Sequence, residues 1–70
     1  MNDINIIHTI YSPSDNKMVA ADGVNFIENN DFVMSKYKIF KSEEDAEKHL
    51  LHISFIGVLV IRRFYIVTPL

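Results

Sequence analysis

The most distinctive hydrophobic pattern in this chain lies in its C-terminal stretch, residues 57–70. In a strand, successive side chains point to opposite faces. One face would carry Val58, Val60, Phe64 and Ile66, and the other would carry Leu59, Ile61, Tyr65 and Val67. Large apolar residues on both sides predict a strand that is covered on both faces. A chain of 70 residues has little material to cover both, so we expect a partner to cover one of them.

The N-terminal half predicts further strands. Residues 4–11 are rich in β-branched side chains and read as a first strand, which the turn formers at 12–16 should end. A second strand is expected within 17–21, and 24–27 would continue it after a tight turn or bulge. Residues 32–40 are expected to form the third strand.

A helix is predicted from about residue 43 to residue 52 or 54. Ser42 is placed to accept hydrogen bonds from the free amides of the first turn, and Asp45 could return a bond to the Ser42 amide. Acidic residues near its start favour the positive end of the helix dipole. The apolar stripe of this helix consists of Ala46, Leu50 and Ile53.

The element order is therefore β-β-β-α-β, which predicts a single α+β domain over residues 1–70. Its mainly antiparallel sheet would have three or four strands, and the helix would lie on one face. No second helix is available for the other face. That shortage is the geometric reason for expecting a partner.

Composition narrows the class of protein. The chain is 49% hydrophobic and 23% charged, as in a globular domain, and it has no cysteine for disulfides or thiolate-bound zinc. Because so short a chain builds a thin core, self-association or binding to a larger protein is the support that remains. A net charge of −2 argues against a sequence-independent nucleic-acid binder. No secretory signal or membrane-spanning run is apparent, so we expect a cytoplasmic protein.

Candidate catalytic and metal-binding residues are few. His49 and His52 have a spacing that metal ligands adopt, with Glu44 or Asp45 nearby, but no third ligand is fixed. His8 stands among isoleucines without a recognisable nucleophile or carboxylate partner. We therefore expect no metal, no cofactor and no catalytic residues.

Candidate interface residues come from the C-terminal strand and the start of the helix. Arg62 and Arg63 must point to opposite faces, either as interface anchors or at the rim of the sheet. The candidate interface residues are Leu59, Ile61, Arg62, Arg63, Tyr65 and Val67. The candidate acidic contacts are Glu43, Glu44 and Glu47. Their simpler interpretation is a solvated helix N-terminus, and the two roles are compatible.

These features predict a non-catalytic protein-interaction module that forms a homodimer and binds or blocks another protein. Small chains without cysteine or motifs are frequent among phage-encoded host-takeover and anti-defence proteins, including anti-CRISPR inhibitors, and that analogy suggests an inhibitor. The alternative is a small nucleic-acid-binding regulator. It would use Lys36, Lys38, Lys41, Arg62 and Arg63.

Overall fold

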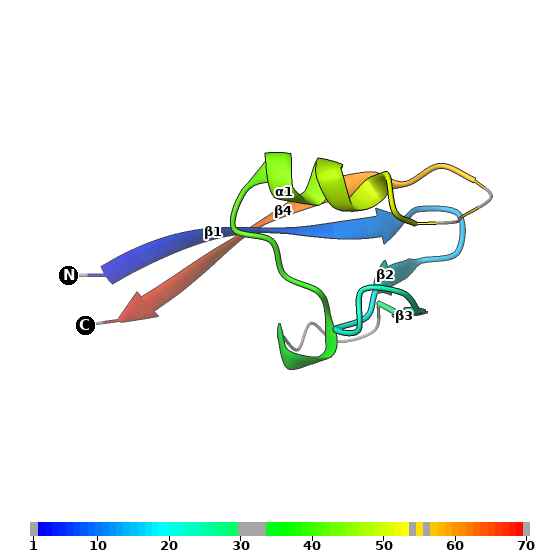
Figure 1. The fold of residues 1–70 in the computed structure, drawn as a ribbon. Coiled ribbons are helices and arrows are strands. Elements are labelled where there is room, and N and C mark those ends of the chain that lie inside the picture. Colours follow the sequence, from blue (N-terminus) through cyan, green and yellow to red (C-terminus); the bar gives the residue numbers. More distant parts are fainter. Residues whose placement is uncertain (1, 30–33, 54, 56, 70) are drawn as a thin grey trace.

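The computed structural model describes residues 2–29, 34–53, 55 and 57–69, and these form a four-stranded antiparallel sheet with one α-helix (Figure 1). The strand order is β3-β2-β1-β4. The elements are β1 (Asn2–Ser12), β2 (Lys17–Val19), β3 (Phe26–Glu28), the 3₁₀ helix η1 (Met34–Lys36), α1 (Glu43–Leu50) and β4 (Val60–Pro69). The predicted α+β class and the β-β-β-α-β order are confirmed. Neither described helix is long and apolar enough to cross a membrane.

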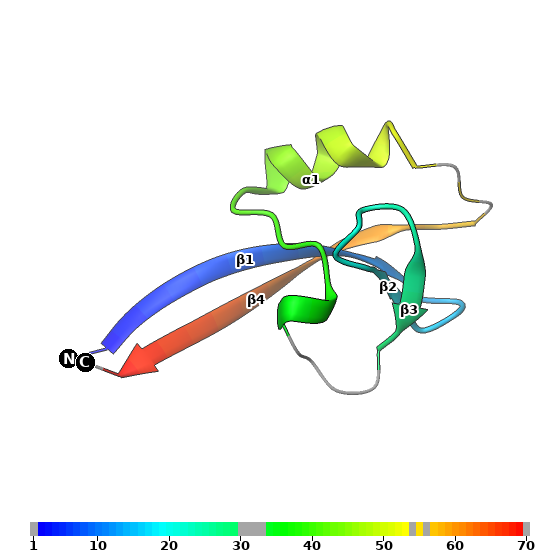
Figure 2. The same ribbon diagram turned by 60° about the horizontal axis from the view of Figure 1, so that its bottom comes forward.

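Strands β1 and β4 are the longest elements of the fold. They pair without interruption from Asn2 opposite Pro69 to Tyr11 opposite Val60. By contrast, β2 pairs with β1 only at the last two residues of β1. The far end of the β1–β4 pair therefore projects from the rest of the molecule as a two-stranded ribbon (Figures 1 and 2). We call residues 2–6 and 65–69 the arm, and the remainder the body.

The third strand is not where the sequence placed it. Of the predicted segment 32–40, residues 32 and 33 lie outside the described part, and Met34–Lys36 is a 3₁₀ helix. The following residues make isolated bridges, Tyr37 with Ala20 and Phe40 with His8. This segment makes backbone hydrogen bonds first to the end of β2 and then to β1, and these two strands diverge. It therefore cannot form a regular ladder along either strand.

The observed third strand, β3, overlaps the segment 24–27, which was expected to continue the second strand. A tight turn separates it from β2. The Asp22 carboxylate accepts hydrogen bonds from the amides of Val24 (2.8 Å) and Asn25 (2.9 Å), and Gly23 takes the left-handed conformation with φ +77°. The chain therefore reverses and pairs β3 with β2 instead of extending β2.

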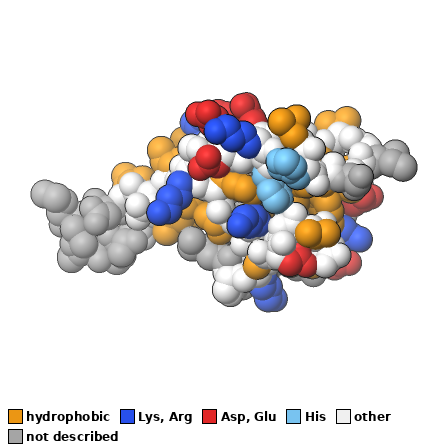
Figure 3. Space-filling view, viewed as in Figure 1, with side chains coloured by type: hydrophobic (Ala, Val, Ile, Leu, Met, Phe, Trp, Pro, Cys, Tyr) orange, Lys and Arg blue, Asp and Glu red, His pale blue; other side chains and the backbone are white. Residues whose placement is uncertain are grey.

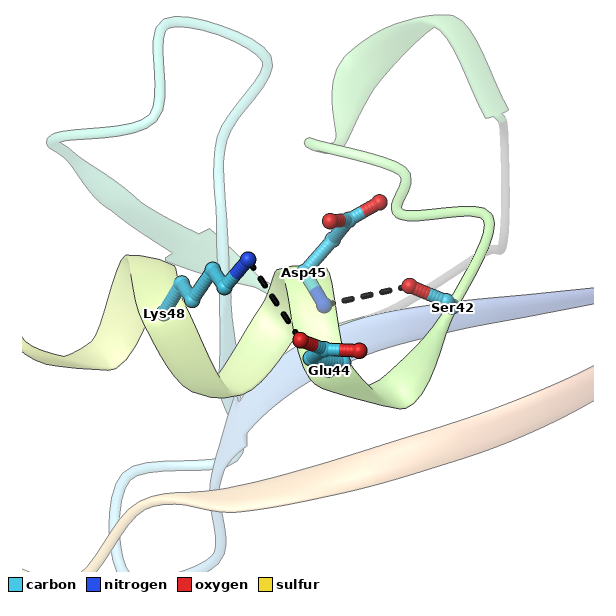
Figure 4. A network of polar contacts seen from close by, with 4 residues as sticks. All are labelled: Ser42, Glu44, Asp45 and Lys48. Carbon is cyan, nitrogen blue, oxygen red and sulfur yellow. Dashed lines mark hydrogen bonds and ion pairs between the residues drawn. The ribbon is translucent and has the colours of Figure 1, made fainter.

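Helix α1 begins as the sequence predicts. The Ser42 hydroxyl accepts a hydrogen bond from the Asp45 amide at 3.1 Å, and Glu44 pairs with Lys48 at 3.4 Å on the exposed surface (Figure 4). The helix ends at Leu50, earlier than expected. After it, the amide of His52 bonds to the carbonyl of His49, a spacing of three residues that tightens the last turn.

The main core lies between α1 and one face of the sheet. Ala46, Ile10 and Val19 are fully or almost fully buried there, with Phe40 beside them. Leu50 packs against this cluster, which confirms the predicted helix stripe for Ala46 and Leu50. Ile53 also packs there, but it lies beyond the end of α1.

The second face of the sheet is not left bare at the body. Ile7, Thr9 and Met18 are buried, and by strand alternation and register they face away from α1. In Figure 2, η1 lies on the side of the sheet opposite α1. Tyr37, which follows η1, is also buried, and its hydroxyl donates to the Glu28 carbonyl at 3.0 Å. The expectation that this face lacks any cover is therefore wrong at the body, because an irregular segment takes the place of a second helix.

Candidate interaction surface

The arm exposes large apolar side chains on its helix-side face. Ile4 stands opposite Val67 and Ile6 stands opposite Tyr65. Residues directly opposite in an antiparallel pair share a face, as do residues two apart along a strand. These four side chains therefore form one continuous surface, which we call the arm patch. Their exposed fractions are 65% for Ile4, 46% for Ile6, 61% for Tyr65 and 53% for Val67.

The arm patch continues a face that α1 covers further along. Ile10 and Ile61 stand opposite each other on this same face and belong to the core beneath the helix. Figure 3 shows hydrophobic side chains at the surface where the arm leaves the body. On the other face of the arm, Asn5 is exposed and Ile66 is half-buried. The apolar surplus is thus concentrated on one face.

The structure divides the predicted interface residues into two groups. Tyr65 and Val67 belong to the arm patch, whereas Leu59 and Ile61 pack against the core. A role for Leu59 and Ile61 in an interface stays a prediction, but both residues contribute to packing within the chain. Sequence reasoning missed Ile4 and Ile6. The alternating isoleucines of β1 were a visible signal, but only the pairing register places them beside β4.

The two arginines point to opposite faces, as the alternation of a strand requires. Arg62 is half-buried on the face away from α1, and its guanidinium carbon lies 4.6 Å from the centroid of the Tyr11 ring. It also lies 5.1 Å from the centroid of the Phe64 ring. Both distances allow cation–π attraction. Arg62 is therefore engaged within the chain.

Arg63 lies on the helix-side face, between the arm patch and the start of α1. Its pKa is raised above the ordinary value first by a hydrogen bond to the side chain of Tyr65. Electrostatic interactions with Tyr65 and with Glu43 act in the same direction. The structure thus brings together three predicted contact residues. Arg63 and Glu43 form a polar border at the body end of the arm patch.

The other acidic candidates, Glu44 and Glu47, are exposed on α1. Glu44 is the residue that pairs with Lys48. Both carboxylates are accessible to a basic partner. Their role in binding stays a prediction.

The histidines have structural contacts. Nε2 of His49 lies 2.8 Å from the Gly23 carbonyl, and since a carbonyl only accepts, this nitrogen donates. The His49 ring also lies 5.3 Å from that of Phe40, so it fastens α1 to the turn before β3. The backbone of buried His8 exchanges hydrogen bonds with Phe40. Among the described residues, no three His, Cys, Asp or Glu side chains are grouped to hold a metal.

The lysines of the nucleic-acid alternative do not line a strand. Lys36 ends η1, Lys38 is half-buried and donates its amide to Val19, and Lys41 precedes the helix. The regular strand that would have aligned the first two is absent from the described residues. Arg62, the fourth member, is already stacked on aromatic rings. The alternative stays a prediction without a supporting surface.

No protein-family model, curated protein or solved structure matches this chain. Function is therefore inferred from the surface of the chain itself. The feature that stands out on that surface is the arm.

Proposed function

We propose that this chain is a non-catalytic protein-interaction module that self-associates and binds or blocks another protein through its arm. The observation that carries the proposal is the arm patch, an apolar surface on a projecting two-stranded ribbon. Contiguous exposed apolar surface commonly marks an interaction site. Burying one such side chain completely is worth roughly 1.5–3 kcal/mol, so partial burial of four could supply several kcal/mol.

The arm also has a polar border that can orient a partner. Arg63 and Glu43 offer opposite charges at the body end of the arm patch. Charged groups at the rim of an interface contribute specificity and association rate more than affinity. The proposed mechanism is steric, because a partner held on the arm would be unable to use the same surface for other contacts.

The wider role that we propose is inhibition of another protein in the cytoplasm. It rests on the small size, the absence of cysteine and the lack of catalytic motifs. A phage-type host-takeover or anti-defence inhibitor has these properties. The arm patch is compatible with that role because it offers apolar surface without grouped reactive side chains among the described residues.

The test compares the arm patch with an exposed apolar residue elsewhere. Ile6→Asn combined with Tyr65→Asn should abolish self-association in light scattering and capture of a partner from the source cell. Val24, 72% exposed in the turn before β3, provides the control Val24→Asn, which should retain both. Circular dichroism verifies that each variant is folded. Wild-type behaviour of a folded double variant would refute the proposal.

A further inference from the structure

The outer edge of β4 is open along its whole length among the described residues. β4 is the last strand of the sheet, and only β1 pairs with it. Natural sheets protect such edges with charged side chains, bulges, proline or a covering segment, because an open edge can recruit another strand. The charged residues of β4 are Arg62, which lies against aromatic rings of its own chain, and Arg63. The one-to-one register of β4 with β1 contains no bulge, and its proline stands at the very end.

A contact on the other side of β1 determines which amides and carbonyls of β4 face this open edge. The amide of His8 donates to the Phe40 carbonyl at 2.8 Å, and the Phe40 amide donates to the His8 carbonyl at 2.9 Å. His8 thus directs both backbone groups away from β4. In an antiparallel pair, hydrogen-bonded and non-hydrogen-bonded residue pairs alternate. The pair of His8 with Arg63 is therefore a non-hydrogen-bonded one.

It follows that Arg63 directs its own amide and carbonyl outward, away from β1. The same holds for every second residue of β4. The outward-facing set consists of Ile61, Arg63, Tyr65 and Val67, followed by Pro69, which has no amide. These residues also carry the side chains of the helix-side face. The open edge and the arm patch are therefore parts of one surface.

We propose that this edge pairs antiparallel with the same edge of a second copy of the chain, around a twofold axis at Phe64. This inference rests on the proposed function and names the partner of the arm. In this register Ile61 pairs with Val67 of the second copy, and Arg63 pairs with Tyr65 of the second copy. Each of these pairs exchanges two backbone hydrogen bonds. Each outward-facing residue from Ile61 to Val67 then has a backbone partner in the other chain.

Neighbouring registers are worse for stated reasons. Moving the axis to Arg63 places the two Arg63 side chains directly opposite each other, and like charges in that position are destabilising. Moving it to Tyr65 places Pro69 opposite Ile61. Proline has no amide to donate to the Ile61 carbonyl, so this pair loses a backbone hydrogen bond. The axis at Phe64 avoids both defects, and this self-complementarity favours a second copy over an unrelated strand.

The proposed register also explains the projecting arm. It places Val67 of one chain beside Ile61 of the other, at the end of the sheet that α1 covers. Tyr65 would lie beside Arg63 of the second copy, which places an aromatic ring next to a guanidinium group. Each arm would thus lie along the body of the other chain. The arm patch would lose solvent exposure in a reciprocal way.

Cysteine cross-linking tests the register directly, because the natural chain contains no cysteine. Residues of a non-hydrogen-bonded pair have Cα atoms about 4.5 Å apart, within the range of a disulfide. Phe64→Cys should therefore form a covalent dimer under mild oxidation. Arg62→Cys and Ile66→Cys are matched controls. Each alone should stay monomeric on a non-reducing gel, whereas an equal mixture of the two should cross-link.

Hydrogen exchange of the wild-type chain tests the same register without a substitution. The outward amides of Arg63, Tyr65 and Val67 should be protected at high protein concentration and should exchange quickly on dilution. Tyr65→Pro removes one outward amide and leaves the pairing with β1 intact. It should weaken dimerisation by about tenfold or more. Tyr65→Thr, which keeps the amide, separates this backbone effect from loss of the ring.

The outcomes distinguish this inference from the proposed function. A dimer in light scattering whose outward amides exchange freely would overturn the β4 pairing and leave self-association standing. Protection that appears only after a target protein is added would assign the edge to that protein and also overturn the pairing. Free exchange in a chain that is monomeric at every concentration and captures no partner would overturn both.

Discussion

The two ends of the β1–β4 pair have similar strand patterns and different surroundings. At the body, Ile10 opposite Ile61 lies beneath α1, and Ile10 has no exposed surface. On the same face of the arm, Ile6 opposite Tyr65 is open to solvent. A helix of eight residues spans about 12 Å, whereas a strand of ten spans about 33 Å. Helix α1 is therefore too short to cover the strand, and the arm is the part that it leaves uncovered.

The largest expected effect comes from breaking the covered end. Ile10→Ala should lower the free energy of unfolding by about 2–5 kcal/mol, because it opens a cavity beneath α1. Ile4→Ala, the matched change in the arm, should alter the stability of the dilute monomer by less than about 0.5 kcal/mol. It should instead weaken self-association. Urea unfolding at low concentration measures the first effect, and light scattering measures the second. Equal losses of stability in the two variants would contradict the division into body and arm.

The comparison also shows how far the sequence determines this fold. The helix was predictable because its signals are local: Ser42 caps it, and Ala46 and Leu50 lie on one stripe. Residues 34–40 were misread as a strand because their backbone bonds are set by two diverging strands that are distant in sequence. No local pattern carries that information.

The candidate site was predictable only in part, for a similar reason. Tyr65 and Val67 were found from the alternation of β4. Their neighbours Ile4 and Ile6 depend on the register between the two ends of the chain. The stacking of Arg62 on Tyr11 likewise depends on packing between two strands. The alternation of a strand determines on which face of the sheet a side chain lies. Whether that side chain is buried depends on which other segments pack against that face.

The two adjacent arginines of β4 differ in the same way as the two ends of the strand. Arg62→Gln should lower the free energy of unfolding by roughly 1–2 kcal/mol, because the guanidinium contacts two aromatic rings and its stem is partly buried. Arg63→Gln should change the stability of the monomer much less, since Arg63 is exposed. Thermal unfolding of both variants at one concentration checks the order. A larger loss for Arg63→Gln would refute the intramolecular role assigned to Arg62.

A smaller effect is expected at the N-terminal cap of α1, the helix of the body. Ser42→Ala removes the acceptor for the Asp45 amide and should lower the free energy of unfolding by about 1 kcal/mol. Ser42→Asp keeps an acceptor at the same position and should restore most of the loss. Chemical denaturation of the dilute monomer gives both values. If the Asp variant were as unstable as the Ala variant, the cap would not explain the effect.

The smallest expected effect is that of acidic pH on the turn before β3. Asp22 lies in this turn, and its Gly23 carbonyl accepts the hydrogen bond from His49 of α1. Backbone hydrogen bonds from Val24, then from Asn25, lower the pKa of Asp22 below the ordinary value of 3.8. Because the folded chain holds this carboxyl deprotonated more strongly than the unfolded chain does, its contribution to stability is present above the ordinary value. That contribution is lost as the pH falls through the lowered pKa.

Asp22→Asn should therefore reduce the dependence of the unfolding midpoint on pH in the acidic range. The effect should be small because Asp22 is exposed. Thermal unfolding from neutral pH to below 3.8 measures it. Asp15→Asn removes one carboxyl from another exposed turn and controls for the change in net charge. An acid dependence altered equally by both variants would show that net charge, and not the bonds to Asp22, is responsible.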